Sequence, residues 1–243
     1  MLCGRAILRR HGVRFFSLVN HFLAYFDPVH LYQAGFQTDA LFAGMVAFVQ
    51  RKYVRGRVRL RNILQHPFFN RYDAIIVDSK GATGVMTELS LLSSTGNVMG
   101  VVKPILPDVR EFIRGSLHML TRLKTYENYG IRLPDISILV NCIENTLLDR
   151  EAMDGLAAII NEKHYDASAL GNRDVYRLLN TRIEALDIFK LGHVKQQPVH
   201  RLEYKTRRKG PAAAVTMHDL ACELFPEWQS HFSDVLTREV RHV

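Results

Sequence analysis

The sequence predicts an α/β fold built on a mostly parallel, doubly wound sheet. The first observation is residues 72–84, where an apolar run over 74–77 ends in a single carboxylate, Asp78, and glycines follow at once. Such a run is typical of a fully buried parallel strand that carries a polar residue to the carboxyl edge of its sheet. The second observation is that strand-like and helix-like segments alternate downstream, which favours a parallel sheet covered on both faces.

The elements follow from local patterns along the chain. Apolar runs predict strands at 98–102, 136–140 and 175–181, the last followed by residues 183–189, and amphipathic segments predict helices at 85–94, 108–128, 149–163 and 212–225. Residues 55–66 alternate arginine with apolar side chains, which suggests either a half-buried strand or the start of a helix before Pro67. Residues 36–50 are compatible with an apolar helix.

Length and composition describe one large globular domain. The chain has 243 residues, of which 47% are hydrophobic and 23% are charged, enough to bury a substantial core. No apolar run approaches the roughly 18 to 20 residues of a membrane span. The three cysteines are widely spaced, and the eleven histidines include no pair at metal-ligand spacing beside acids. A reducing cytoplasm is therefore the expected location.

The net charge of +8 is unevenly distributed along the chain. Residues 1–71 contain eleven Lys or Arg and only two acids, Asp27 and Asp39, whereas the rest of the chain is close to neutral. This asymmetry indicates either a polyanionic partner or an N-terminal segment that does not belong to the fold. An organellar transit peptide is compatible with the arginine content, but a secretory signal peptide is not indicated.

Several motifs carry a resemblance to a known family. They are Asp-Ser-Lys-Gly-Ala-Thr-Gly-Val at 78–85, Glu-Leu-Ser-Leu-Leu at 88–92, the stretch 102–115, Ile-Leu-Val-Asn at 138–141 and the stretch 197–203. In this order they resemble the ParA/Soj branch of the ParA/MinD-type partition ATPases, and within it the ParA-like proteins of plasmids and integrating conjugative elements. The resemblance covers roughly 57–225. It divides the chain into a basic segment, 1–50, of unclear status and a ParA-like α/β domain, 51–243.

The resemblance implies a P-loop NTPase type of sheet that lacks the family's first strand, phosphate loop and first helix. It implies a role in DNA partition, with ATP and Mg²⁺ as cofactors and non-specific DNA, a ParB-like protein and a second copy of the chain as partners. It also implies a cytoplasmic, nucleoid-associated location and no membrane contact.

The resemblance also assigns roles to individual residues. Asp78 matches the catalytic carboxylate that holds Mg²⁺ directly or through water, and Gly81 matches the glycine that meets the terminal phosphate. Asn141 and Thr181 match positions near the adenine base. From the residues alone, Asp78 and Asn141 are equally well explained as polar residues in ordinary turns after a strand.

The phosphate-binding loop itself is missing. A P-loop needs glycines, a lysine and a Ser/Thr in one short motif, and this sequence contains no Gly-Lys dipeptide. Two explanations remain: a truncated or frame-disrupted gene, or a degenerate relative that keeps the scaffold. Either way we expect ATP hydrolysis to be weak or absent, so whether the chain is an enzyme stays open.

A basic cluster follows the last predicted strand. It consists of Arg201, Lys205, Arg207, Arg208 and Lys209. These side chains are either DNA contacts made through backbone phosphates or a solvated loop. The alternative to a partition ATPase is accordingly a non-enzymatic module that binds DNA or a protein partner.

Overall fold

The computed structural model describes residues 15–19, 57–79, 84–95, 98–197, 199–203 and 213–230. The chain forms two compact units. The N-terminal unit comprises Leu2–Thr95 together with Arg122–Pro134, and the C-terminal unit comprises Gly96–Thr121 together with Asp135–Val243.

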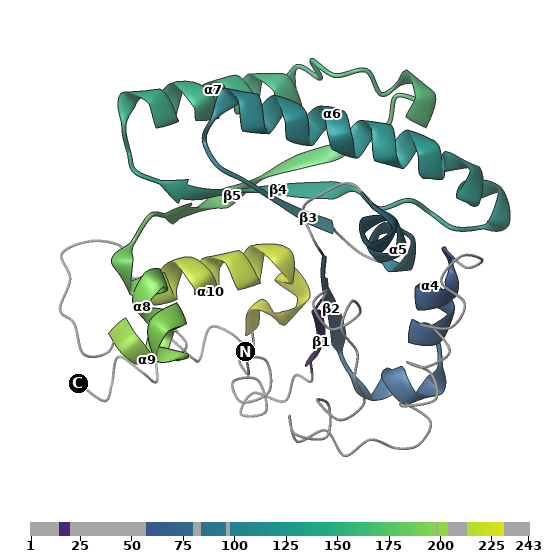
Figure 1. Ribbon diagram of the computed structural model, residues 1–243, viewed down its shortest axis with the longest axis horizontal. Coiled ribbons are helices and arrows are strands. Elements are labelled where there is room, and N and C mark those ends of the chain that lie inside the picture. Colours follow the sequence, from purple (N-terminus) through teal and green to yellow (C-terminus); the bar gives the residue numbers. More distant parts are fainter. Residues whose placement is uncertain are drawn as a thin grey trace. The chain divides into compact units, whose positions relative to one another are not determined.

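A parallel three-stranded sheet forms the centre of the C-terminal unit. Its order is β3 (Val98–Val102), β4 (Ile136–Ile143) and β5 (Tyr176–Glu184), so β4 is paired on both sides (Figure 1). Residues 136–140 of β4 are all buried, which is why this stretch is apolar apart from Ser137. The predicted α/β class and all three predicted strands of this unit are confirmed, although β4 and β5 each extend three residues beyond the predicted end.

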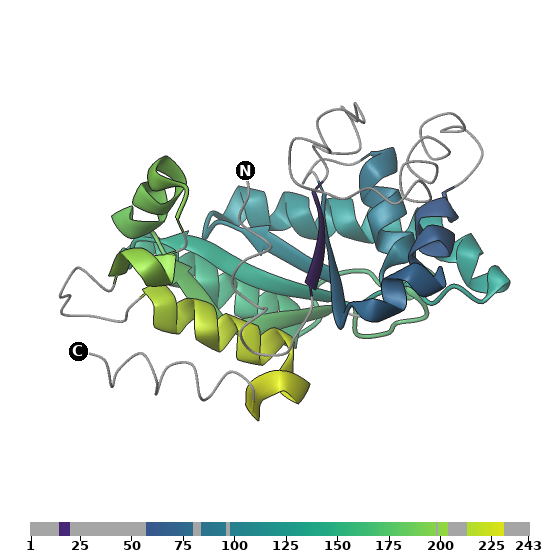
Figure 2. The same ribbon diagram turned by 90° about the horizontal axis from the view of Figure 1, so that it is seen from below.

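Helices lie on both faces of this sheet. α6 (Leu106–Leu123) and α7 (Leu147–Asn161) cover one face, and α10 (Ala213–Leu224) covers the other (Figures 1 and 2). Two short helices, α8 (Asp187–Lys195) and α9 (Val199–Glu203), connect β5 to α10. The observed helices confirm the predicted ones to within a few residues, except that α6 ends early.

α6 ends at Leu123 rather than near 128 because the backbone changes there from α-helical to 3₁₀ geometry. A 3₁₀ turn over Lys124–Tyr129 follows the helix, and Gly130 then adopts a left-handed conformation with φ of 73°. Glycine tolerates this backbone region without the steric cost that other residues incur. The amphipathic pattern continues past the helix end, which explains why the sequence alone placed the boundary too late.

α10 contributes to a leucine cluster on the second face of the sheet. Leu220 of α10 packs with Leu139 of β4 and Leu179 of β5, and all three are buried. Ile183 and Leu224 are partly buried against the cluster. Because residues alternate between faces along a strand, Leu139 faces α10 while its buried neighbours on β4 face the other way.

The first face depends on a close approach of α6 to β3 at Gly100. A Cβ atom at this position would overlap the ring of Phe112 on α6, with the ring Cε2 only 2.6 Å away. The absence of a side chain on Gly100 therefore sets how closely α6 packs on the sheet.

The N-terminal unit contains a two-stranded parallel pair. β1 (Phe15–Val19) pairs with β2 (Ala74–Asp78), with Val19 opposite Asp78. The sequence predicted β2 but not β1, which lies in the basic segment. The expectation that β2 is fully buried is wrong, because Ile76 is 45% exposed and Asp78 is exposed. Among the described residues β2 pairs with β1 only, and a two-stranded pair shields less surface than a wide sheet.

The helical alternative for residues 55–66 is confirmed. α4 (Arg59–Leu64) precedes a 3₁₀ turn over Pro67–Arg71, and α5 (Val85–Ser93) follows β2. Pro67 is well placed at the start of its turn because proline lacks an N–H donor and has a fixed φ. The apolar helix suggested at 36–50 lies outside the described residues. No helix in the described part of the chain combines the length and apolar character needed to cross a membrane.

We predict that Gly100→Ala lowers the free energy of unfolding by about 1–3 kcal/mol, because the added methyl group overpacks the α6 contact. Urea unfolding followed by circular dichroism measures the change. Gly155→Ala on α7 is the matched control, because its Cβ would lie 3.3 Å from the flexible end of Leu106 and alanine favours helices. A neutral Gly100→Ala variant would contradict the close packing described here.

Candidate functional site

Polar residues collect at the carboxyl edge of the β3-β4-β5 sheet, where parallel sheets place ligand chemistry. Asn141 lies near the end of β4, opposite Ile183 of β5. The next pair joins Ile143 to Glu184, so Cys142 is an extra residue on β4. Cys142 has φ of 61° and is exposed, which identifies a β-bulge. The Asn141 side-chain Oδ1 accepts the Cys142 N–H at 2.8 Å and so supports the bulge.

The loop after β4 is held by two carboxylates. Asn145, with φ of 61°, donates through Nδ2 to Glu184 Oε1 at 3.2 Å, which ties the ends of β4 and β5 together. Asp149 Oδ2 accepts the N–H groups of Glu144 at 2.8 Å and Thr146 at 3.2 Å. The Thr146 hydroxyl in turn accepts the Asp149 N–H at 3.1 Å, completing a capping box that starts α7. The edge loop is therefore ordered by its own side chains.

A second irregularity interrupts β5. Leu178 lies opposite Ile138 and Arg182 lies opposite Val140, so three residues of β5 face one residue of β4. The backbone N–H groups that have no partner on β4 donate instead to the Glu223 carboxylate on α10. Its Oε1 accepts the Asn180 N–H at 2.7 Å, and its Oε2 accepts the Thr181 N–H at 2.8 Å. A carboxylate thus takes the place of the missing strand hydrogen bonds.

The environment of Glu223 favours its charged form. Partial burial by itself raises the pKa of this carboxyl, but the hydrogen bonds from Asn180 and Thr181 outweigh it, aided by the nearby charge of Arg177. The net effect holds the pKa of Glu223 below its ordinary value. Arg177 also donates through Nη2 to the main-chain oxygen of Glu223 at 3.4 Å. The charged form of Glu223 therefore joins α10 to β5 at the bulge.

The predicted site residues fall in different parts of the molecule. Asp78 is at the end of β2 in the N-terminal unit, whereas Asn141 and Thr181 lie on neighbouring strands of the C-terminal unit. Gly81 lies outside the described residues. Arg201 belongs to α9, but its side chain is not described. The other members of the basic cluster, Lys205, Arg207, Arg208 and Lys209, lie outside the described residues.

Two of the residues expected near a nucleotide base already make contacts within the protein. The Thr181 N–H is already donated to Glu223, and the Asn141 Oδ1 is already engaged by Cys142. No group of three or more His, Cys, Asp or Glu able to hold a metal ion occurs within the described residues. The sequence also contains no Gly-Lys dipeptide, and no hydrolytic step is assigned to this chain.

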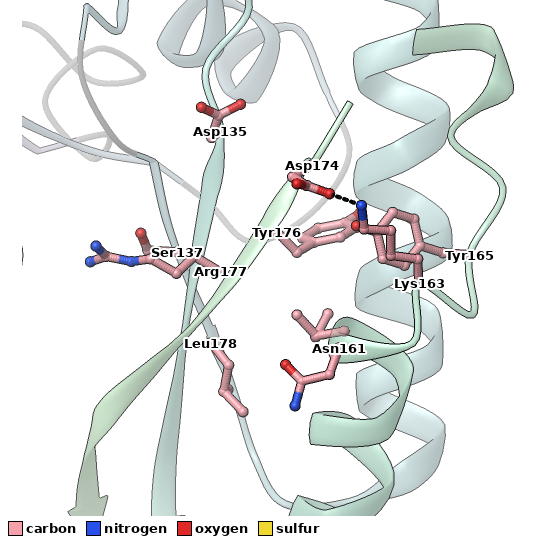
Figure 3. A pocket seen from close by; sticks show the side chains of 10 residues that line it. Asp135, Ser137, Asn161, Lys163, Tyr165, Asp174, Tyr176, Arg177 and Leu178 are labelled. Carbon is pink, nitrogen blue, oxygen red and sulfur yellow. Dashed lines mark ion pairs between the residues drawn. The ribbon is translucent and has the colours of Figure 1, made fainter. Parts of the chain in front are cut away.

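A cavity of about 500 Å³ opens at the opposite edge of the same sheet, where β4 and β5 begin (Figure 3). Its charged groups are largely paired: Lys163 Nζ lies 2.6 Å from Asp174 Oδ1, and Asp135 Oδ1 lies 3.7 Å from Arg173 Nη1. The hydrogen bond and charge of Asp174 raise the pKa of Lys163. The lining residues are Asp135, Ser137, Ile160, Asn161, Lys163, Tyr165, Asp174, Tyr176, Arg177 and Leu178.

Tyr176 forms the buried wall of this cavity. Its ring packs edge-on against Tyr165, and its hydroxyl donates to the Ile113 main-chain oxygen at 3.0 Å. The Ser116 hydroxyl lies 2.6 Å from the Tyr176 hydroxyl oxygen. Burial raises the pKa of Tyr176, so its phenol remains a neutral donor. Sequence reasoning missed this cavity because its residues come from three separate elements and form no local motif.

No family model matches this chain, and no curated protein is significantly similar to it.

We predict that Glu223→Gln lowers the free energy of unfolding by about 1–2 kcal/mol at neutral pH, because the amide NH₂ faces a backbone N–H. The folded-state pKa of Glu223 is depressed, so its contribution is complete above the unfolded-state pKa and is lost as the pH falls through the folded-state value. The difference between wild type and variant should therefore shrink toward acid pH in urea titrations.

The control for this experiment is Glu227→Gln, which changes an exposed glutamate in the turn after α10. We expect it to alter stability by less than about 0.5 kcal/mol at any pH. A Glu223→Gln protein that matches this control at neutral pH would show that the bulge does not depend on the carboxylate.

Proposed function

We propose that this chain is a ParA-like DNA-partition protein from a mobile element. In this proposal it binds DNA through backbone phosphates and turns over ATP weakly or not at all. The relevant partners are non-specific duplex DNA, a ParB-like protein and a second copy of the chain.

The observation that carries the proposal is how the family-like motifs fall on the strands. Asp78 ends β2, Lys103 and Pro104 follow β3, and Asn141 lies at the end of β4. Each motif thus lies at or near the carboxyl end of a parallel strand, where α/β proteins place functional residues. The order of the motifs along the chain supports the same family resemblance.

The charge distribution supports a polyanionic partner. The excess of positive charge lies in residues 1–71, which contain eleven Lys or Arg and two acids. Lys and Arg side chains that contact phosphates release condensed counterions, which drives sequence-independent binding. Such binding requires no base contacts, in keeping with non-specific DNA as the ligand.

We predict that the full chain binds a fluorescently labelled random-sequence duplex, with an affinity that decreases steeply as salt rises. The logarithm of the binding constant should change with the logarithm of salt by about −0.9 per phosphate contacted. Fluorescence anisotropy with and without ATP measures this. Equal binding in both conditions favours the non-enzymatic module over the partition ATPase, and no binding at low salt would contradict the proposal.

We also predict that phosphate release from ATP stays at the buffer background, because the cradle that stabilises the transferring phosphoryl group is missing. The Asp78→Ala variant is the control and should give the same background rate. A Mg²⁺-dependent rate that this substitution abolishes would contradict the expectation and would restore Asp78 as a catalytic residue.

A further inference from the structure

Among the described residues of the N-terminal unit, one carboxylate is buried. Glu88 on α5 is only 3% exposed and lies among the buried leucines of the same helix, Leu89, Leu91 and Leu92. Removing a carboxylate from water is costly unless opposite charges and hydrogen bonds compensate it. A buried Glu88 carboxylate is therefore expected to have positively charged partners.

Two arginines from distant parts of the sequence converge on Glu88. Arg57, which precedes α4, places Nε 3.1 Å from Glu88 Oε2. Arg122, in the last turn of α6, places Nη2 2.8 Å from Glu88 Oε1. All three residues belong to the N-terminal unit. Arg122 donates a hydrogen bond to the carboxylate, whereas Arg57 makes an ion pair without hydrogen-bond geometry. One carboxylate thus holds two guanidinium groups beside it.

Both guanidinium groups remain open to solvent. The Arg57 side chain is 43% exposed and the Arg122 side chain is 49% exposed, whereas the carboxylate between them is buried. Each guanidinium has five N–H donors in a planar fork, and Glu88 engages only part of each fork. A phosphate that approaches from solvent therefore meets donors rather than the carboxylate.

The described part of the N-terminal unit carries a net positive charge. The two guanidinium groups outweigh the single carboxylate, and the described residues of the unit add five further Lys or Arg against three acids. Because the ion pairs with Glu88 already hold both side chains beside one carboxylate, a ligand restricts less side-chain freedom when it binds. Fixed, convergent guanidinium donors are the arrangement that phosphate oxygens bind best.

We propose that Arg57 and Arg122 form a phosphate-contact site for the DNA backbone, with Glu88 as the residue that positions them. This inference rests on the DNA binding proposed above and assigns it to a defined pair of side chains. The sequence-derived basic cluster at 201–209 is a separate stretch of chain.

The test uses charge-balanced double variants of the full chain. Glu88→Gln/Arg122→Gln and Glu88→Gln/Arg57→Gln each remove one positive and one negative charge, so the net charge is unchanged and no buried carboxylate loses its partner. The matched control is Glu111→Gln/Arg114→Gln, which removes an exposed ion pair of 2.8 Å on α6. Binding to the labelled random-sequence duplex is measured by anisotropy over a series of salt concentrations.

We expect each Glu88 double variant to reduce the salt slope by about one and to weaken binding on the order of tenfold at low salt. The control double variant should retain the wild-type salt slope and the wild-type affinity. Wild-type slope and affinity in both Glu88 variants would overturn the inference while leaving the proposed function standing. A wild-type chain that does not bind DNA would overturn both.

A second measurement needs no variant and stays informative if the variants do not fold. Wild-type protein is treated with phenylglyoxal, which modifies accessible guanidinium groups, with and without the duplex, and the products are mapped by mass spectrometry. We expect DNA to slow the modification of Arg57 and Arg122 several-fold relative to Arg114. Equal rates with and without DNA at Arg57 and Arg122 would overturn the inference.

Discussion

The C-terminal unit depends on the pairing of β4 on both of its sides and the burial of both of its faces. A parallel strand with partners on each side satisfies its backbone hydrogen bonds only if its neighbours stay in register. β4 meets this requirement between β3 and β5, while helices cover both faces. The position of α6 is then limited by Gly100, and that of α10 by the leucine cluster around Leu139. This packing therefore determines where the residues at the carboxyl end of β4 lie.

The regular pairing breaks down toward the carboxyl end of the sheet, and carboxylates compensate there. Glu223 accepts backbone donors from the β5 bulge, Glu184 accepts the Asn145 side chain, and Asp149 accepts donors from the loop before α7. The Glu223 carboxylate replaces hydrogen bonds that a regular strand would have made, whereas Glu184 and Asp149 order the loop between β4 and α7. Bulges at such edges redirect side chains, and the bulge on β4 leaves Cys142 exposed with a left-handed backbone. Irregular geometry therefore coincides with the edge where ligand chemistry is expected.

In the N-terminal unit a buried carboxylate, Glu88, forms ion pairs with two arginines that remain partly exposed. Glu88 lies inside, where it fixes two arginines, and those arginines present their remaining donors to solvent. A buried ion pair alone is weak evidence for stability, because desolvation offsets most of the attraction. Its more direct effect is geometric, since it sets the orientation of the guanidinium groups. The phosphate site proposed for Arg57 and Arg122 follows from this orientation, in a unit whose sequence is already rich in positive charge.

The sequence by itself determined the α/β class, strands β2 to β5, and helices α5, α6, α7 and α10, because apolar periodicity records which face of each element is buried. Asp78 was correctly placed at a strand end for the same reason, whereas β4 continues past Asn141 to Ile143. Only the tertiary structure decided the pairing of β1 with β2, the bulges, the contact of Glu223 with Asn180 and Thr181, and the convergence of Arg57 and Arg122 on Glu88. These contacts join residues more than 30 positions apart, and local patterns do not specify which distant partners will meet.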